Sequence, residues 1–168
     1  DKFKKENYRE YLFWQFVQYE FFRQWKALKK YANDRNVYII GDVPLYVAYD
    51  NADVWRHPEL FKLKSDLTAE KIAGVPPDYF SKTGQLWGNP VYRWSEHRKD
   101  GYSWWIERLR RSFELYDVVR LDHFRGFDRY YEVDADSLTA ERGVWRKGPA
   151  CELFEQTEKV LGKLNIIA

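Results

Sequence analysis

A helical stretch followed by a short apolar run occurs three times along this chain of 168 residues. Within each helical stretch, apolar side chains recur at intervals of three and four residues, which indicates an amphipathic helix with one face on a core. The three stripes are Trp14, Val17, Phe21, Trp25 and Leu28; Trp105, Ile106, Leu109 and Phe113; and Leu153, Phe154, Val160 and Leu161. Each leads into a run typical of a buried strand, namely 37–40, 117–119 and 166–168. This alternation predicts parallel strands with crossover helices, an α/β architecture.

Three such units fit an arc of a (β/α)8 TIM barrel better than a complete domain, because a barrel of this kind needs eight strands. We therefore expect residues 1–168 to be an internal part of a catalytic barrel. The chain contains no Met and begins within what looks like a running segment, which favours a longer parent protein. Asp42 follows the first apolar run and Asp122 the second. Both aspartates are candidate site residues, because the chemistry of such barrels lies at the carboxyl ends of the strands.

Composition excludes several classes of function. The chain is 45% hydrophobic, and its 28 basic residues nearly balance its 26 acidic ones, for a net charge of +2. This balance argues against a nucleic-acid-binding surface, which needs a concentrated basic face. No apolar run reaches the length of a membrane span, so we expect no membrane partner. Cys151 is the single cysteine, which excludes an internal disulfide and a cysteine-based metal cluster and favours a reducing compartment.

Arg120 and Asp122 form the most informative pair in the sequence. They lie two residues apart at the end of the second apolar run, so their side chains are expected on the same face of a strand. A guanidinium beside a carboxylate lowers the pKa of that carboxyl and keeps it ionised. An ionised, oriented carboxylate is suited to act as a glycosidase nucleophile. The alternative is a structural ion pair that closes the strand.

A long excursion, from about residue 48 to residue 99, separates the first unit from the second and contains no obvious helix. Connections of this length are usually functional or disordered. This one is rich in Trp, Tyr and Phe, which favours order. Between residues 74 and 90, prolines stiffen the backbone and glycines permit tight turns, so side chains can be presented at fixed positions.

The aromatic and amide side chains of this excursion suit a sugar. Tyr79, Phe80 and Trp87 offer flat surfaces for the apolar faces of a pyranose ring. Gln85 and Asn89 can both donate hydrogen bonds to hydroxyls and accept them. The alternative is that the three aromatic residues only pin the excursion to the barrel. Taken as a set with the interleaved amides, they favour sugar contact.

Several segments of the chain resemble those of a known family. The segments that carry the resemblance are 40–47 (Ile-Gly-Asp-Val-Pro-Leu-Tyr-Val), 76–80 (Pro-Pro-Asp-Tyr-Phe), 87–90 (Trp-Gly-Asn-Pro) and 120–127 (Arg-Leu-Asp-His-Phe-Arg-Gly-Phe), with further matches at 51–55 and 145–149. They are similar, in the same order and over nearly the whole chain, to the 4-alpha-glucanotransferases of glycoside hydrolase family 77. These enzymes are also called amylomaltases or disproportionating enzymes.

The resemblance implies a retaining transfer of α-1,4-glucan on a (β/α)8 barrel. It implies that Asp122 is the nucleophile, that Arg120 orients and ionises it, and that His123 bonds the sugar at the cleavage subsite. It gives Asp42 a supporting role at the end of an earlier strand. It places three aromatic residues on a loop that arches over the bound glucan, namely Tyr79, Phe80 and Trp87. The expected partners are a maltooligosaccharide donor and a glucose or glucan acceptor, and the chemistry needs no cofactor or metal.

One departure from the family pattern bears on activity. The family's acid/base glutamate lies in an Ala-Glu-Asp-Leu-Gly motif, one residue beyond the point where this sequence reaches Ala168. The family's second aspartate lies further on. We therefore expect residues 1–168 alone to be unable to catalyse the transfer, although the parent enzyme does.

Two other classes of function compete with this interpretation. A non-catalytic glucan-binding module could use the same aromatic residues, and an α-amylase-type hydrolase could use the same nucleophile. The 76–80 motif weighs against the hydrolase. The resemblance favours a cytoplasmic protein in a bacterium, or a plastid protein in a plant.

Several other residues with ionisable side chains are expected to lie in loops or on the surface, without a role in the site. His57 and His97 are expected in loops or on the surface, since no partner pattern marks them as metal ligands. Helical spacing places Arg108, Arg110 and Arg111 on the solvated face of their helix.

Overall fold

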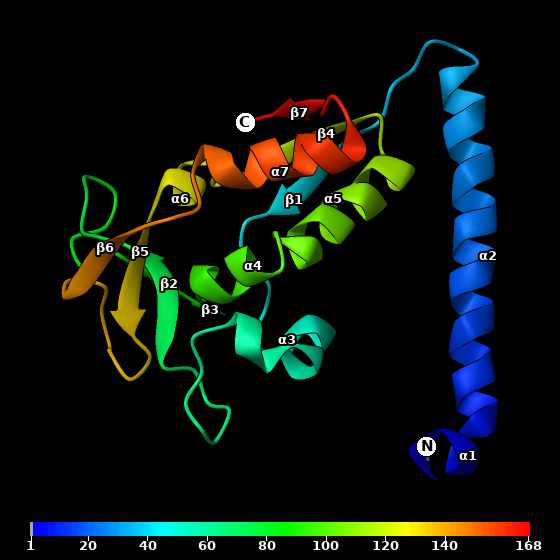
Figure 1. Ribbon diagram of the computed structural model, residues 1–168. Helices are drawn as coiled ribbons and strands as arrows, with labels where there is room; N and C mark the ends of the chain where they lie inside the picture. The colour runs from blue at the N-terminus through cyan, green and yellow to red at the C-terminus, as the bar shows by residue number, and fades with distance from the viewer. Residues whose placement is uncertain (1) are drawn as a thin grey trace.

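A three-stranded parallel sheet forms the centre of the molecule. The computed structural model describes residues 2–168, and in it the strands β1 (Ile40–Pro44), β4 (Val118–Asp122) and β7 (Ile166–Ile167) lie in the order β1-β4-β7 (Figure 1). β1 pairs with β4 and β4 with β7, both in parallel. The predicted parallel pairing is confirmed, and the sheet formed by the described residues is open rather than closed.

Two crossover helices cover this sheet. α5 (Ser103–Leu115) and α7 (Cys151–Leu161) contact each other and lie side by side in Figure 1. Trp105 and Leu109 on α5 and Leu153 on α7 are fully buried in the main core. Burying a side chain of this size contributes roughly 1.5–3 kcal/mol, which is why the helical stripes hold the helices on the sheet.

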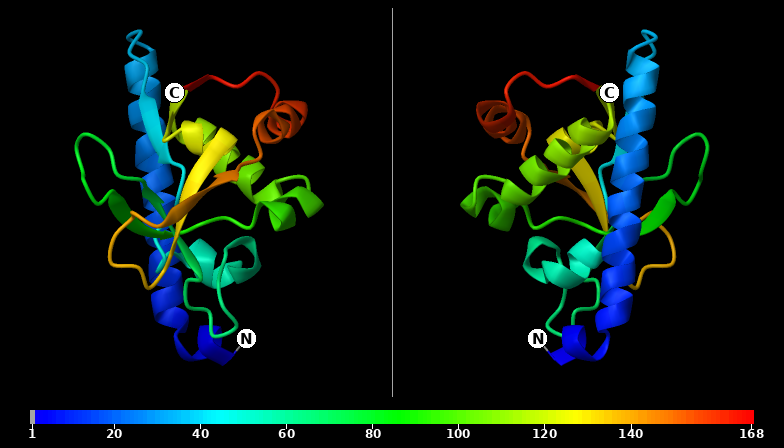
Figure 2. Two further views of the ribbon diagram at one scale, coloured as in Figure 1. Left: turned by 90° about the vertical axis from the view of Figure 1, so that its left-hand side faces the viewer. Right: turned by 90° about the vertical axis from the view of Figure 1, so that its right-hand side faces the viewer.

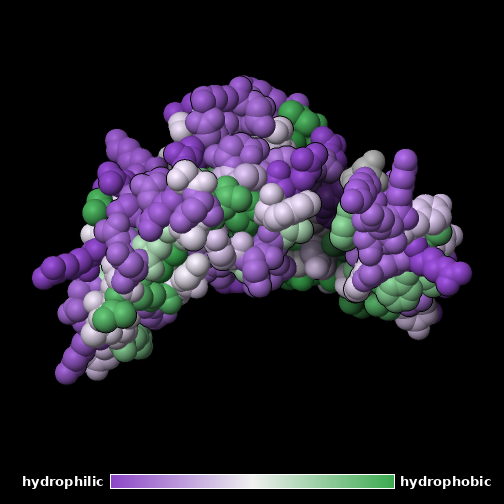
Figure 3. All heavy atoms as spheres, turned by 90° about the horizontal axis from the view of Figure 1, so that it is seen from below, coloured by the Kyte–Doolittle hydropathy of each residue, from purple (hydrophilic) through white to green (hydrophobic). Residues whose placement is uncertain are grey.

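The N-terminal helices differ from the expectation. α1 (Lys2–Glu6) and α2 (Tyr8–Asn33) have no buried residues. In the predicted stripe of α2, Trp14, Phe21 and Leu28 are exposed. Figures 1 and 2 show α2 at one side of the molecule, and Figure 3 shows hydrophobic surface in its region. The helix prediction is therefore confirmed, but the described residues do not supply the core that its aromatic stripe was expected to face.

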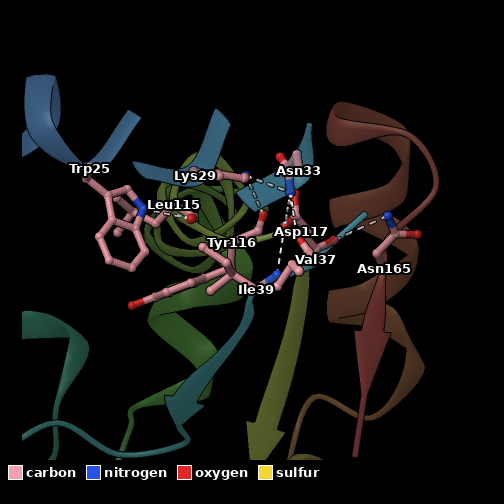
Figure 4. Close-up of polar contacts among 9 residues, drawn as sticks. All are labelled: Trp25, Lys29, Asn33, Val37, Ile39, Leu115, Tyr116, Asp117 and Asn165. Atoms are coloured by element: carbon pink, nitrogen blue, oxygen red, sulfur yellow. Dashed lines mark hydrogen bonds and ion pairs between the residues drawn. The ribbon is translucent and has the colours of Figure 1, made fainter. Parts of the chain in front are cut away.

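Polar contacts anchor the C-terminal end of α2 to the loop before β4 (Figure 4). Asp117 Oδ2 accepts hydrogen bonds from Asn33 Nδ2 at 2.9 Å and from the Ile39 amide at 2.8 Å, and Oδ1 lies 3.5 Å from Lys29 Nζ. Trp25 Nε1 donates to the carbonyl of Leu115 at 2.8 Å. These contacts lie at the amino ends of the strands, the end opposite Asp122.

The first strand begins later than predicted. The apolar run 37–40 was expected to be the strand, with Asp42 after it, but β1 spans Ile40–Pro44 and contains Asp42. Along β1, exposed and buried residues alternate, with Gly41 and Val43 buried. Hydrophobicity alone placed the strand over the wrong residues, because the apolar side chains of Val37 and Tyr38 are exposed and lie before the strand begins.

Two strands of the excursion belong to a second sheet, which was not predicted. The excursion contains α3 (Ala52–Arg56), the 3-10 helix η1 (Pro58–Leu60), β2 (Lys71–Val75), β3 (Gln85–Pro90) and α4 (Trp94–Lys99). β2 and β3 join β5 (Arg129–Asp134) and β6 (Gly143–Lys147) in an antiparallel sheet of order β3-β2-β5-β6. The short helix α6 (Arg125–Asp128) links β4 to β5. The expectation of an excursion without a helix is therefore wrong, whereas its order is as predicted.

Two residues that were predicted to lie in loops or on the surface, His97 and Arg108, are instead buried or half-buried. His97 on α4 is completely buried, and its Nε2 lies 3.2 Å from the Leu60 carbonyl. Burial lowers the pKa of His97 to about 4. Arg108 is half-buried and contacts the end of β1, whereas Arg110 and Arg111 are exposed as predicted. No helix among residues 2–168 combines the length and the apolar character that crossing a bilayer requires.

Candidate active site

The carboxyl ends of β1 and β4 bring three charged side chains together. The parallel register places Asp42 opposite Arg120 and Pro44 opposite Asp122. Arg120 Nη1 lies 2.8 Å from both carboxylate oxygens of Asp42, and Nη2 donates to Asp122 Oδ1 at 2.6 Å. The prediction that Arg120 and Asp122 share a face is confirmed, and Asp42 joins them from the neighbouring strand.

One guanidinium thus bridges two carboxylates. The hydrogen bonds to Asp122 and Asp42, together with their charges, raise the pKa of Arg120. Among residues 2–168, the Asp122 carboxylate forms this one hydrogen bond, through Oδ1, so Oδ2 is not engaged. The side chain of Asp122 is 50% exposed. A carboxylate with one oxygen fixed by a hydrogen bond and the other accessible has the geometry that nucleophilic attack requires.

His123 turns the chain away from β4 in a left-handed conformation, with φ of 52°. Its ring packs edge-on against Trp87, with ring centroids 4.9 Å apart. Gly126 permits Leu45 and the His123 ring to pack closely against it, because a Cβ there would come within 2.2 Å of Leu45 Cδ2 and 2.9 Å of His123 Cδ2. Burial lowers the pKa of His123, although the charge of Asp122 opposes the shift. A neutral imidazole can donate one hydrogen bond and accept another, as recognition of sugar hydroxyls requires.

A cavity of about 180 Å³ opens beside the nucleophile candidate. Its lining contains predicted residues together with a segment that follows β1: Pro44, Leu45, Tyr46, Trp87, Asn89, Asp122 and His123. Sequence reasoning missed Pro44, Leu45 and Tyr46 as site residues, although they lie in the 40–47 motif. Larger hollows, such as one of about 520 Å³ beside α3, lie away from the Arg120 cluster.

The two aromatic residues at the tip of the excursion are open to solvent. Tyr79 is 97% exposed and Phe80 is 90% exposed, and their rings pack edge-on with centroids 5.7 Å apart. Asp78 Oδ1 accepts hydrogen bonds from the amides of Phe80 and Ser81, which fixes the turn that carries them. Neither ring pins the excursion to the rest of the described structure. Both are available to contact a ligand.

Trp87, Gln85 and Asn89 lie closer to the strand ends. Trp87 is 37% exposed, and its Nε1 donates to Gln85 Oε1 at 3.2 Å. Asn89 Nδ2 donates to the Val47 carbonyl at 2.9 Å. Gln85 therefore braces Trp87, and Asn89 holds the chain that leaves β1. Within residues 2–168, the other polar atom of each amide remains available for a hydroxyl.

No group of three or more His, Cys, Asp or Glu side chains within residues 2–168 is arranged to hold a metal ion. The polar side chains at the strand ends are one guanidinium, two carboxylates, an imidazole and two amides. This set can orient a carboxylate and bind hydroxyl groups.

Comparison with known proteins shows the family. The profile of the 4-alpha-glucanotransferases, glycoside hydrolase family 77, matches residues 1–168. The chain belongs to this family. A 4-alpha-glucanotransferase of Streptococcus pneumoniae is 55% identical over 168 residues, covering 97% of this chain and 33% of the relative. A chloroplastic/amyloplastic 4-alpha-glucanotransferase of Solanum tuberosum is 45% identical over 151 residues, covering 90% of this chain and 26% of the relative.

The structure also matches part of a solved amylomaltase. The structure of amylomaltase from Streptococcus agalactiae in complex with acarbose matches with a TM-score of 0.87 and 50% sequence identity. The match covers 90% of this chain and 30% of that one. The chain spans about a third of the length of the Streptococcus pneumoniae relative and about a quarter of that of the Solanum tuberosum relative. Its mixed α/β arrangement is therefore a part of the larger amylomaltase structure.

Proposed function

We propose that the protein is a 4-alpha-glucanotransferase that transfers a segment of an α-1,4-glucan to the 4-hydroxyl of glucose or of another glucan. The observation that carries the proposal is the Arg120 bridge between Asp42 and Asp122, at the strand ends beside an exposed aromatic loop. This arrangement combines a fixed nucleophile with a surface for sugar rings. Membership of the family supports the same activity.

The proposed reaction has two steps with retention of configuration. In the first, Asp122 Oδ2 attacks the anomeric carbon, and the bond from this carbon to the leaving 4-oxygen breaks. A carboxylic acid gives its proton to that oxygen. In the second step, the 4-hydroxyl of the acceptor attacks the glycosyl-enzyme, releases Asp122, and returns its proton to the same acid/base group.

Within residues 2–168, the two carboxylates at this site, Asp42 and Asp122, are both bound to Arg120. Each carboxylate already accepts hydrogen bonds from the guanidinium, so neither is placed to give a proton to the leaving oxygen. The acid/base group is therefore a third residue. We assign Asp122 as the nucleophile, Arg120 as the residue that orients it, and Asp42 as the residue that holds Arg120 from the other side.

The proposed substrate contacts follow the surface beside Asp122. His123 bonds a hydroxyl near the cleavage point, and Trp87 contacts a sugar face. Tyr79 and Phe80, which are open to solvent, close over the glucan and exclude water, so that an acceptor hydroxyl reacts in its place. Gln85 and Asn89 contribute the remaining hydrogen bonds to hydroxyls. The proposed partners are a maltooligosaccharide donor and a glucose or glucan acceptor.

We propose that residues 1–168 form an arc of a (β/α)8 TIM barrel, with residues 48–99 as the excursion that carries the glucan contacts. The open edges of β1 and β7 and the exposed aromatic face of α2 support this proposal, since further barrel elements would cover both. In a bacterium the protein would act in the cytoplasm, and in a plant in the plastid.

Asp122→Asn in the full-length protein tests the proposal. Asparagine keeps the shape of the side chain but is a poor nucleophile, so disproportionation of maltotriose should fall by about 10³-fold or more. Binding of maltooligosaccharides should persist. Asp136→Asn, a change on an exposed loop, is the matched control and should keep full activity.

The products separate the competing functions. A transferase converts maltotriose into glucose and longer glucans, whereas a hydrolase yields only glucose and maltose. A glucan-binding module would bind maltotriose and convert none of it. If Asp122→Asn kept its activity, the assignment of the nucleophile would be wrong.

A further inference from the structure

Arg108 on α5 reaches the point where the chain leaves β1. Its Nη2 donates to the Pro44 carbonyl at 2.8 Å, and its Nη1 donates to the Leu45 carbonyl at 3.2 Å. Parallel-sheet pairing ends at Pro44, so these carbonyls lie where the strand no longer supplies partners. Leu45 is buried, so its carbonyl requires a donor, whereas Pro44 is exposed; one guanidinium donates to the carbonyls of both.

The guanidinium is held in place by aromatic neighbours. Its central carbon lies 4.8 Å from the ring centre of Trp105 and 5.4 Å from that of Trp104, and Trp105 is fully buried. An arginine between aromatic rings is restricted in orientation and gains a cation–π attraction. Burial lowers the pKa of Arg108, but a guanidinium remains protonated in proteins.

A second donor acts on the same segment. Tyr92, which is buried, donates from its hydroxyl to the Leu45 carbonyl at 2.8 Å and accepts from Arg108 Nη1 at 3.5 Å. Its ring stacks on Tyr46, with centroids 5.9 Å apart and the planes 19° from parallel. The backbone of Leu45 and the ring of Tyr46 are therefore fixed from the same side.

The segment that Arg108 holds is a wall of the candidate active site. Pro44, Leu45 and Tyr46 line the cavity that also contains Asp122 and His123. Pro44 is the register partner of Asp122, so a shift of this carbonyl moves the neighbour of the nucleophile. The ring of Tyr46 also lies 6.4 Å from the ring of His123, measured between centroids.

We propose that Arg108 is a positioning residue for glucan transfer, which sets the exit of the chain from β1 and thereby the wall of the cavity beside Asp122. The proposal rests on the proposed function for its effect on activity. Arg108 touches neither the nucleophile nor the substrate surface, so it acts through Pro44, Leu45 and Tyr46. Misplacing reacting groups by about 1 Å costs roughly 10²-fold in rate, which sets the expected effect of losing it.

Arg108→Met in the full-length protein is the main test, because methionine retains the packing of the stem but donates no hydrogen bond. The kcat for maltotriose should fall by about 10²-fold per folded molecule, with little change in KM, because the glucan contacts are elsewhere. Arg108→Lys should recover part of the loss, since an ammonium can reach one carbonyl but lacks the fork that spans both. Arg111→Met is the control, because Arg111 pairs with Glu107 and Glu114 on the surface of α5.

Tyr92→Phe is an independent test. It removes the hydroxyl that donates a hydrogen bond to the Leu45 carbonyl. Its kcat should fall in the same direction as that of Arg108→Lys. If Arg108→Met fails to fold, these two variants decide the question. Melting temperatures that fall while kcat per folded molecule stays at the wild-type value in both would overturn the proposal, since Arg108 would then act on stability alone.

Hydrogen exchange separates this proposal from the proposed function. Arg108→Met should raise amide exchange in peptides covering residues 45–48 and leave β2 unchanged. If the wild-type protein transfers no glucan, the proposed function fails, but the exchange measurement still tests whether Arg108 fixes this segment. Unchanged exchange at residues 45–48 would overturn the positioning role.

Discussion

Asp117 and Asp122 lie at opposite ends of the same short stretch of chain and have different environments. Asp122 is half-exposed and paired with one arginine, which suits reaction. Asp117 is bound on several sides, by the Ile39 amide, by Asn33 and by Lys29. Burial alone would raise the pKa of Asp117, but these hydrogen bonds and the charge of Lys29 together lower it. One carboxylate is thus available for chemistry, whereas the other holds α2 to the sheet.

We expect Asp117→Ala to lower the free energy of unfolding of the full-length protein by about 1–3 kcal/mol at neutral pH, because it leaves the Ile39 amide and Asn33 without their acceptor. Since the pKa of Asp117 is lower in the folded state, its contribution is present above the unfolded-state pKa and lost as the pH falls through the folded-state pKa. Urea unfolding at several pH values measures this.

Asp34→Ala is the control for that measurement, because the Asp34 carboxylate forms an exposed pair with Lys30. Such pairs contribute about 0–1 kcal/mol. Equal effects of the two substitutions would contradict the role of Asp117.

At the scale of elements, the antiparallel sheet carries a buried carboxylate. Glu132 on β5 is 3% exposed, and it accepts from Lys62 Nζ at 2.5 Å and from Arg146 Nε at 2.7 Å. Lys62 precedes β2 and Arg146 lies on β6, so one side chain ties the excursion to the segment after β4. The aromatic residues at positions 79, 80 and 87 depend on this sheet for their placement.

We expect Glu132→Ala to destabilise the full-length protein by about 3–5 kcal/mol, because it leaves the charge of Lys62 half-buried without a partner. Glu155→Ala, an exposed change on α7, should alter stability by about 0.5 kcal/mol or less. Thermal unfolding of the two variants compares them. A stability of Glu132→Ala within error of Glu155→Ala would show that the network contributes nothing.

At the scale of the whole molecule, two surfaces of residues 2–168 lack a covering. The exposed apolar side chains of α2 include Phe13, Trp14 and Phe16, and the parallel sheet is open at β1 and at β7. An unpaired strand edge and an aromatic helix face favour association with other polypeptide segments. In the full-length protein, the proposed remainder of the barrel provides the polypeptide segments that cover these two surfaces.

We expect a polypeptide of residues 1–168 alone to show no measurable transfer from maltotriose, while the full-length protein is active. The site would have a nucleophile without its acid/base partner, and loss of a general acid alone costs about 10²–10⁴-fold in rate. Chromatography of glucan products from equal molar amounts of both measures this. Normal turnover by residues 1–168 would contradict the proposal that a third carboxyl group is needed.

Local periodicity accounts for what could be predicted. The helical stripes on α5 and α7 and the spacing of Arg120 and Asp122 depend on residues that are near one another in sequence. Asp42 was predicted from its place after an apolar run, and the aromatic and amide residues of the excursion were predicted from their suitability for sugar contact. His123 came from the resemblance to a family. Residues 44–46 were missed because nothing in their local pattern indicates that they line a cavity.

The sequence by itself therefore determined the succession of the three helix and strand units, the parallel pairing of β1, β4 and β7, and the shared face of Arg120 and Asp122, because helix and strand periods are local properties of the chain. Tertiary structure alone decided that β2 pairs with β5, that His97 is buried and that Arg108 meets the end of β1 rather than solvent. The bond of His97 spans 37 positions of the chain and that of Arg108 spans 64, so their geometry depends on how whole elements pack. Such packing has no signature in the spacing of neighbouring residues.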